Sequence, residues 1–271
     1  MLTNIKAKEG SEVLNAGRDI IQNDFSKFLP ELRGMLEMNL KQNNLLIEEK
    51  FKNLNLVLEV LELKISKNKD KINFQEKLKE PDTVEFISES VEKASLKGKK
   101  IDFNTLSSII ATRLITNENL TELIYEQAGK ALLSLTPLQV KQLGSLYFSQ
   151  MISWGDIKKD EENIYLENTY SNWKDYLNFN ITIDTKNHFA ALGLISLSAT
   201  GFINGHLIFN KMHENRYGID LFFDLNSTYK NIEKIYDEHN LSQVSTTTVG
   251  QIIGLEYLRN FGEFSYINCH D

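Results

Sequence analysis

The stretch IEEKFKNLNLVLEVLELKI, residues 47–65, carries the pattern that decides the fold class. Its large apolar side chains recur at intervals of four, three, four, three and four residues, the spacing of one face of an α-helix. The members of this seam are Ile47, Phe51, Leu54, Leu58, Leu61 and Ile65. Further apolar residues widen the stripe, as in a helix that packs on two sides within a bundle or between subunits. We interpret it as a bundle helix and keep an oligomeric coiled coil as the alternative, because the seam runs for barely three heptads.

The same rhythm continues on the N-terminal side of this stretch. Phe25, Leu29, Leu32 and Leu36 follow it, and the phase slips near Leu40. Residues 24–65 are therefore predicted to form one long helix, two helices in line or a helical hairpin. We divide the chain into a short extended assembly motif (1–23), this long helix or hairpin (24–72) and a helical bundle domain (73–271).

Helix-start signals recur along the chain. All three prolines are expected in the first turn of a helix, where proline loses no hydrogen bond. They are Pro30, Pro81 and Pro137. Thr136 and Gln139 have the spacing of a capping box, and Asp102 is placed to cap the helix after it. Because alternating apolar runs are nearly absent, the sequence predicts an all-α fold, a multi-helix bundle preceded by a short extended element.

Composition excludes several classes of protein. The chain has 271 residues, of which 41% are hydrophobic, so it can bury a sizeable core and is not a disordered chain. A net charge of −7 argues against general nucleic-acid binding, which needs a basic surface. The single cysteine, Cys269, excludes an intramolecular disulfide and a cysteine-rich zinc site. Since no signal peptide follows Met1, we expect a cytoplasmic protein.

Motifs that carry chemistry are missing from the sequence. It contains no H-E-x-x-H, no phosphate-binding glycine loop and no G-x-S-x-G elbow. We therefore assign no catalytic, cofactor-binding or metal-binding residue, expect no cofactor, and favour a protein that is not an enzyme. Gly250 and Gly254, inside an apolar helix at 247–261, indicate close helix packing. A hydrolase or nuclease site dispersed over His188, His206 and Glu214 is kept as an alternative.

Residues 187–210 contain no Asp, Glu, Lys or Arg. We interpret this segment as a buried helix over 188–198 followed by a glycine turn at Gly201 and Gly205. The alternative is a segment that inserts into a membrane after a trigger, which would make the protein a membrane-acting effector.

Several motifs together resemble a family of bacterial proteins known only by locus-tag names. GSEVLNAGRDIIQ (10–22) is similar to the family's N-terminal Q-A-G-R-D-[IV] motif, with Asn15 in place of Gln. FQEKLKEPDTVEFISESVEKASLKGKK (74–100) is similar to its P-D segment, and LSSIIATRLI (106–115) to its L-x-x-[IL][IL]-x-x-R-[IL] stretch. TTVGQIIGLEYL (247–258) is similar to its T-x-V-G-x-x-I-[GA] helix. The central helices also resemble, more distantly, the Abi-alpha type abortive-infection proteins.

The resemblance implies an all-helical protein and carries over no catalytic residue. The N-terminal motif is similar to tags that precede modules of bacterial conflict and phage-defence proteins, where it implies a β-rich assembly element. We therefore expect a self-assembling homo-oligomer, with a protein partner from the same operon as a further option and membrane contact only as the minor alternative. The predicted assembly residues are Val13, Ala16, Gly17, Arg18, Asp19, Ile20, Ile47, Phe51, Leu54, Leu58, Leu61 and Ile65.

Overall fold

The computed structural model describes residues 25–42, 47–67, 74–77, 79–151, 174–198 and 238–262. Within these ranges the fold is all-α with one small two-stranded sheet, so the predicted fold class is confirmed. The helices are α1 (Phe25–Gln42), α2 (Ile47–Ser66), α3 (Phe74–Lys77), α4 (Pro81–Lys97), α5 (Phe103–Ile115), α6 (Asn119–Leu132), α7 (Pro137–Met151), α9 (Ile183–Ala191) and α12 (Thr248–Arg259). The short elements are the 3₁₀ turns η3 (Gly98–Lys100), η4 (Lys174–Tyr176) and η5 (Leu241–Gln243) and the strands β1 (Ile195–Leu197) and β2 (Val244–Thr246).

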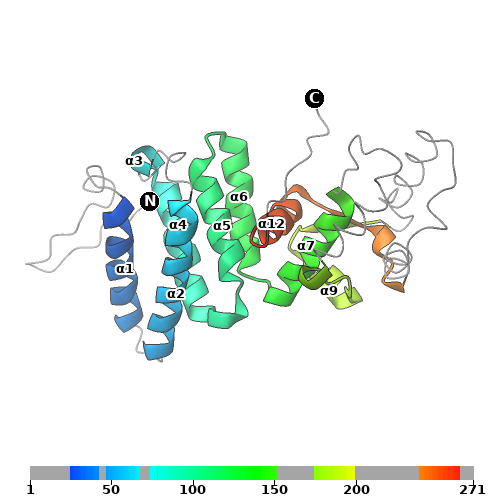
Figure 1. Ribbon diagram of the computed structural model, residues 1–271, viewed down its shortest axis with the longest axis horizontal. Coiled ribbons are helices and arrows are strands. Elements are labelled where there is room, and N and C mark those ends of the chain that lie inside the picture. The colour runs from blue at the N-terminus through cyan, green and yellow to red at the C-terminus, as the bar shows by residue number, and fades with distance from the viewer. Residues whose placement is uncertain are drawn as a thin grey trace, which may run out of the picture.

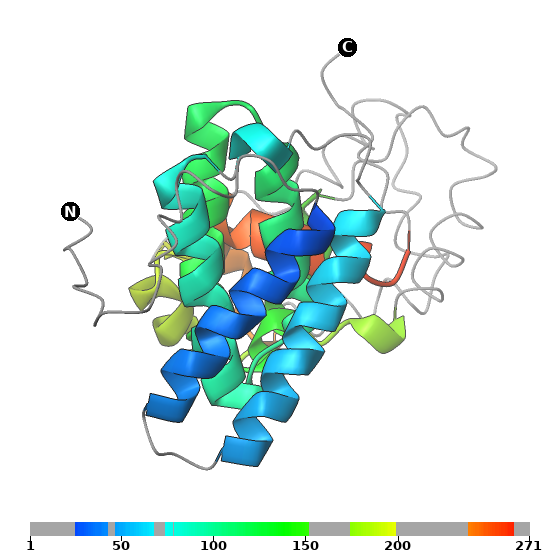
Figure 2. The same cartoon turned by 90° about the vertical axis from the view of Figure 1, so that its left-hand side faces the viewer.

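The seam of residues 47–65 forms the buried side of α2. Leu54, Leu58, Leu61 and Ile65 are each at most 1% exposed, and α2 packs against α1, α4 and α5. Figure 2 shows α1 folded back beside α2, so the two form an antiparallel hairpin and do not continue in line. The interpretation of α2 as a bundle helix is confirmed, because four of its six seam residues are buried within this chain.

Most of the predicted helix starts are confirmed. α4 begins at Pro81 and α7 at Pro137. At the start of α7, the Thr136 N–H donates to Gln139 Oε1 at 2.9 Å, and the Gln139 N–H donates to Thr136 Oγ1 at 3.3 Å. These reciprocal bonds satisfy two N–H groups that an isolated helix end leaves without partners.

Two further helix starts gave different outcomes. The Asp102 side chain accepts a hydrogen bond from the Thr105 N–H at 2.9 Å, so its predicted role as the cap of α5 is confirmed. The prediction for Pro30 is wrong, since this proline lies inside α1, which begins at Phe25. Proline in a helix interior removes one backbone donor, and burial of the neighbouring apolar face outweighs that loss here.

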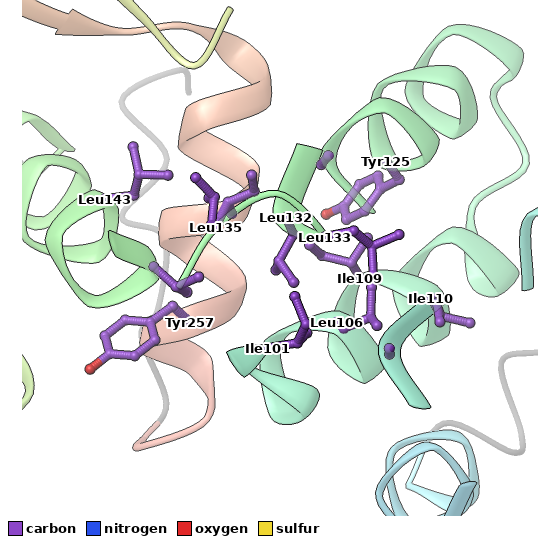
Figure 3. Packing of buried hydrophobic residues seen from close by; sticks show 14 of the residues in the cluster. Ile101, Leu106, Ile109, Ile110, Tyr125, Leu132, Leu133, Leu135, Leu143 and Tyr257 are labelled. Atoms are coloured by element: carbon purple, nitrogen blue, oxygen red, sulfur yellow. The ribbon is translucent and has the colours of Figure 1, made fainter. Parts of the chain in front are cut away.

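The helices follow one another along the long axis of the molecule (Figure 1). α1 lies at one end, α2, α4, α5 and α6 come next, and α7 and α9 lie toward the other end. α12 occupies the middle and packs against α5, α6 and α7. Figure 3 shows Leu132, Leu133 and Leu135, from the end of α6 and the turn after it, between α5 and α12. One apolar core therefore extends from α1 to α12.

The uncharged segment after residue 187 folds differently from the prediction. α9 already ends at Ala191, and the chain turns at Gly193, which has a φ of +69° that favours glycine. β1 then pairs antiparallel with β2, with Ile195 opposite Thr246. The predicted helix over 188–198 is confirmed up to Ala191 and wrong beyond it, because the pairing partner of β1 lies far away in the sequence. Gly201 and Gly205 lie outside the described residues.

The described part of this segment contributes to the protein core. Phe189, Leu194 and Ile195 are at most 3% exposed. None of the helices in the described ranges combines the length and the apolar character that crossing a membrane requires.

Candidate functional site

Arg113 is the centre of a group of polar and charged side chains where α3, α4, α5 and α6 meet, in which Asp82 is 67% exposed and the others are buried. It lies in the last turn of α5 and is 2% exposed. Its Nη1 donates to Thr83 Oγ1 at 2.6 Å, and its Nη2 donates to Asp82 Oδ2 at 3.2 Å. Glu122, in the first turn of α6, lies 3.8 Å from Nη2 and accepts a charge-assisted hydrogen bond from Lys77 of α3. We call these five residues the Arg113 cluster.

The charges of the Arg113 cluster suit the helix ends on which they lie. Asp82 and Glu122 are in the first turns of α4 and α6, where the helix dipole favours an anion, and Arg113 is at the C-terminal end of α5, where it favours a cation. The Arg113 guanidinium also lies over the Phe86 ring, 5.8 Å from its centroid. Gly129 makes room for this ring, because a Cβ there would lie 2.6 Å from Phe86 Cζ.

A second buried group surrounds Glu256 of α12, which is 2% exposed. Its Oε1 accepts hydrogen bonds from Thr112 Oγ1 at 3.2 Å, Tyr125 Oη at 3.3 Å and Arg259 Nη1 at 2.8 Å. Burial raises the pKa of the Glu256 carboxyl, because desolvation outweighs these bonds. Burial also raises the pKa of Tyr125, and the nearby Glu256 charge adds to that shift. We call these four residues the Glu256 cluster; they join α12 to α5 and α6.

The end of α12 is also joined to α2. Asn260 Oδ1 accepts from the Lys64 ammonium and, at 3.0 Å, from the Ser108 hydroxyl. Asn260 Nδ2 donates to Thr105 Oγ1 at 3.2 Å. Burial lowers the pKa of Lys64, and the neighbouring Lys67 lowers it further. The last described helix is thereby connected to the second and the fifth by side-chain hydrogen bonds.

The glycines of α12 lie against α7 and the turn before β1. A Cβ on Gly254 would lie 2.5 Å from Tyr147 Cβ and 2.9 Å from Leu143 O, both on α7. A Cβ on Gly250 would lie 2.0 Å from Leu194 O. Real Cβ atoms do not approach other atoms this closely. The prediction of close helix packing is confirmed for Gly254, whereas Gly250 packs against the turn before β1 instead of a helix.

These arrangements fix helices against one another. The hydrogen bonds of the Arg113 and Glu256 clusters run to side chains of neighbouring helices or the same helix, and no described part of the chain gathers three or more His, Cys, Asp or Glu side chains in a group suited to a metal ion. His188, from the dispersed hydrolase set, has its Nε2 3.2 Å from Ser134 O. His206 and Glu214 lie outside the described residues. The geometry supports a role for both clusters in packing.

The predicted assembly residues divide into two groups. Val13, Ala16, Gly17, Arg18, Asp19 and Ile20 lie outside the described residues. Of the seam, Ile47 begins α2, Phe51 is partly buried, and the other four residues are buried within the chain. The assembly role of both groups stays a prediction.

Sequence reasoning missed the charged residues of both clusters. Their signal was a charge on an otherwise apolar helix: Arg113 follows Ile-Ile-Ala-Thr, and Glu256 stands between Leu255 and Tyr257. A charge on the buried side of a helix requires a partner, because an unpaired buried charge is costly. The sequence pattern therefore indicates that both charged residues need partners, but it does not identify those partners.

Taken together, the fold and the two clusters define a helical-bundle protein whose buried charges join its helices. The model of an uncharacterised protein family matches residues 19–224, and the chain belongs to that family. The description of the family reads ":-like" and names no activity. Neither the curated proteins nor the solved structures give a match to this chain.

Proposed function

We propose that this chain is a non-enzymatic helical protein that acts by self-association in a bacterial phage-defence or conflict system. The observation that carries the proposal is a set of four exposed apolar side chains on the α1–α2 hairpin, which we call the outer hairpin. Met35 and Met38 of α1 are 39% and 59% exposed, and Leu56 and Leu63 of α2 are 38% and 62% exposed. Exposed apolar side chains on a hairpin at one end of the molecule favour contact with another protein surface.

The buried charged residues are a second observation in support of this proposal. Arg113 and Glu256 are bound to neighbouring side chains and hold helices in place. Because these charged groups bond to other side chains of the fold, we favour a protein that acts through contacts on its surface and not through a catalytic site.

The defence context rests on resemblance. The motif at 10–22 is similar to tags ahead of modules of phage-defence proteins, and the central helices resemble the Abi-alpha type. We accordingly propose a homo-oligomer in the cytoplasm, with a protein encoded in the same operon as a further partner. The membrane-acting alternative loses support in residues 187–198, since part of that segment lies in the core.

Size-exclusion chromatography with light scattering tests self-association directly. The full chain, at about tens of micromolar, is expected to have the mass of an oligomer, and deletion of residues 1–22 is expected to lower that mass. A monomer in both samples contradicts the proposal.

Plaque assays on bacteria that express the chain test the defence role. The full chain is expected to protect the bacteria, and the deletion variant is expected to lose this protection. Equal plaque numbers with and without the chain contradict that role.

A further inference from the structure

A groove of about 360 Å³ lies between α1 and α2 on the outer hairpin. Buried Leu29 and Leu58 line it, together with Pro30 and Gly34 from α1. A Cβ built on Gly34 meets nothing within 4 Å, so the backbone of α1 is open to a neighbouring surface there. This differs from Gly254, where α7 fills the space.

Charged residues stand around this groove. Arg33 and Glu37 lie one turn apart on α1, and Glu62 comes from α2. Within the described ranges, none of these three side chains forms an ion pair. Their charges are therefore available to another chain.

We propose that the groove binds α1 of a second copy of this chain, with the two α1 helices antiparallel about a twofold axis. This inference rests on the proposed self-association and names its surface. A twofold interface presents the same patch on both sides, so the patch must complement itself. With the axis at the level of residue 35, Arg33 of each copy lies opposite Glu37 of the other. Two ion pairs form in this way, and Glu62 offers each arginine a second carboxylate.

The apolar contacts fit the same arrangement. Side chains of a helix lean toward its N-terminus, so Met38 covers the surface about one position before its own Cα. Across the same axis, position 37 lies opposite position 33 of the second copy, and the surface at that level is the spot that a side chain at Gly34 would cover, where the groove is open. Met38 is 59% exposed, and a flexible thioether side chain fills an irregular gap well.

Charge reversal in the full chain tests this inference. Arg33→Glu sets two carboxylates against each other at both ends of the interface, and Glu37→Arg does the same with two cations. Each is expected to raise the dimer dissociation constant at least tenfold, measured by analytical ultracentrifugation over a dilution series. The double variant R33E/E37R restores both pairs with reversed sign, although Glu62 then faces a carboxylate at position 33, and is expected to bind at least about threefold more tightly than either single variant.

Two further variants separate the interface from folding. Gly34→Leu fills the groove in the path of Met38 and is expected to weaken association while the helical circular dichroism stays unchanged. Glu59→Arg reverses an exposed charge of α2 outside the groove and is the matched control, with an expected change below about twofold.

The outcomes distinguish this inference from the proposed function. An oligomer that none of the groove variants weakens overturns the inference and leaves self-association standing. Single variants that weaken association without rescue in the double variant overturn it too, as does an equal effect of Glu59→Arg. Association lost only when residues 1–22 are deleted assigns the interface to that segment and also overturns it. A wild-type monomer contradicts both proposals.

Discussion

Replacing Gly254 with alanine is expected to destabilise the protein, although alanine is the better helix former. The added Cβ would lie 2.5 Å from Tyr147 Cβ and 2.9 Å from Leu143 O, whereas ordinary contacts begin at 3.4 Å. Neither atom is the far end of a flexible side chain. α7 and α12 would therefore have to separate by roughly 1 Å along their contact, as in an overpacked core.

The magnitude follows from two opposing effects. In a helix interior, alanine is favoured over glycine by ~1 kcal/mol. Overpacking a well-packed core costs about 1–3 kcal/mol, and the upper part of that range applies because the contacted atoms move only with α7. Gly254→Ala is thus expected to lower the free energy of unfolding by ~1–2 kcal/mol.

Gly34→Ala is the matched control, since it makes the same change in α1 where a Cβ meets nothing within 4 Å. It is expected to raise the free energy of unfolding by about 0.5–1 kcal/mol. Urea unfolding followed by circular dichroism measures both, at the lowest workable protein concentration so that association contributes least. Equal stabilisation by the two variants would refute the argument that α7 and α12 pack at glycine-limited distance.

Two further predictions concern the buried clusters. Glu256→Gln keeps an acceptor for Tyr125 and removes the titration of the carboxyl. Because burial raises the pKa of Glu256 in the folded state, the folded protein binds this proton more tightly than the unfolded chain, and the contribution of Glu256 to stability falls as pH rises from its ordinary pKa to the raised one. The stability of the variant relative to the wild type is therefore expected to increase with pH across that window, measured by urea unfolding at a series of pH values. Arg113→Met removes the buried hydrogen bond to Thr83 and one of the two cations beside Glu122, whereas Asp82 is 67% exposed and stays solvated; the variant is expected to cost ~1–3 kcal/mol in the same assay, as loss of a buried hydrogen bond to a charged group does.

Each of these predictions has a result that contradicts it. A stability difference between Glu256→Gln and the wild type that is constant with pH would show that this carboxyl does not titrate differently on folding. For Arg113 the control is Lys93→Met, which removes the exposed Lys93–Glu89 pair and is expected to cost below about 0.5 kcal/mol. Similar losses for the two variants would contradict the structural role of the Arg113 cluster.

Local signals predicted the helices well. Pro81, the Thr136–Gln139 box and Asp102 act within one turn of the chain, so their effect is readable without knowledge of the rest. The prediction for Pro30 is wrong because packing of α1 against α2 outweighs a local preference. The strands were missed for a different reason, since β1 and β2 each gain their hydrogen bonds from a segment far along the chain.

In the candidate site, too, local sequence predicted some features and not others. The glycine pair of α12 was predicted to serve close packing, because small residues at helical spacing permit approach whatever the partner. The Arg113 cluster was not predicted, since its members come from four helices and no spacing within one helix relates them.

By itself, the sequence determined which side of each helix is apolar and where several helices begin, because periodicity and capping are properties of a single segment. Only the tertiary structure decided what those sides contact. It buried four residues of the α2 seam against helices of the same chain, brought α12 back between α6 and α7, and joined Arg113 to α4 and α6. The physical reason is that the hydrophobic effect has no direction. An apolar stripe on a helix must be buried, but it does not specify the segment that buries it, which depends on the packing of the whole chain.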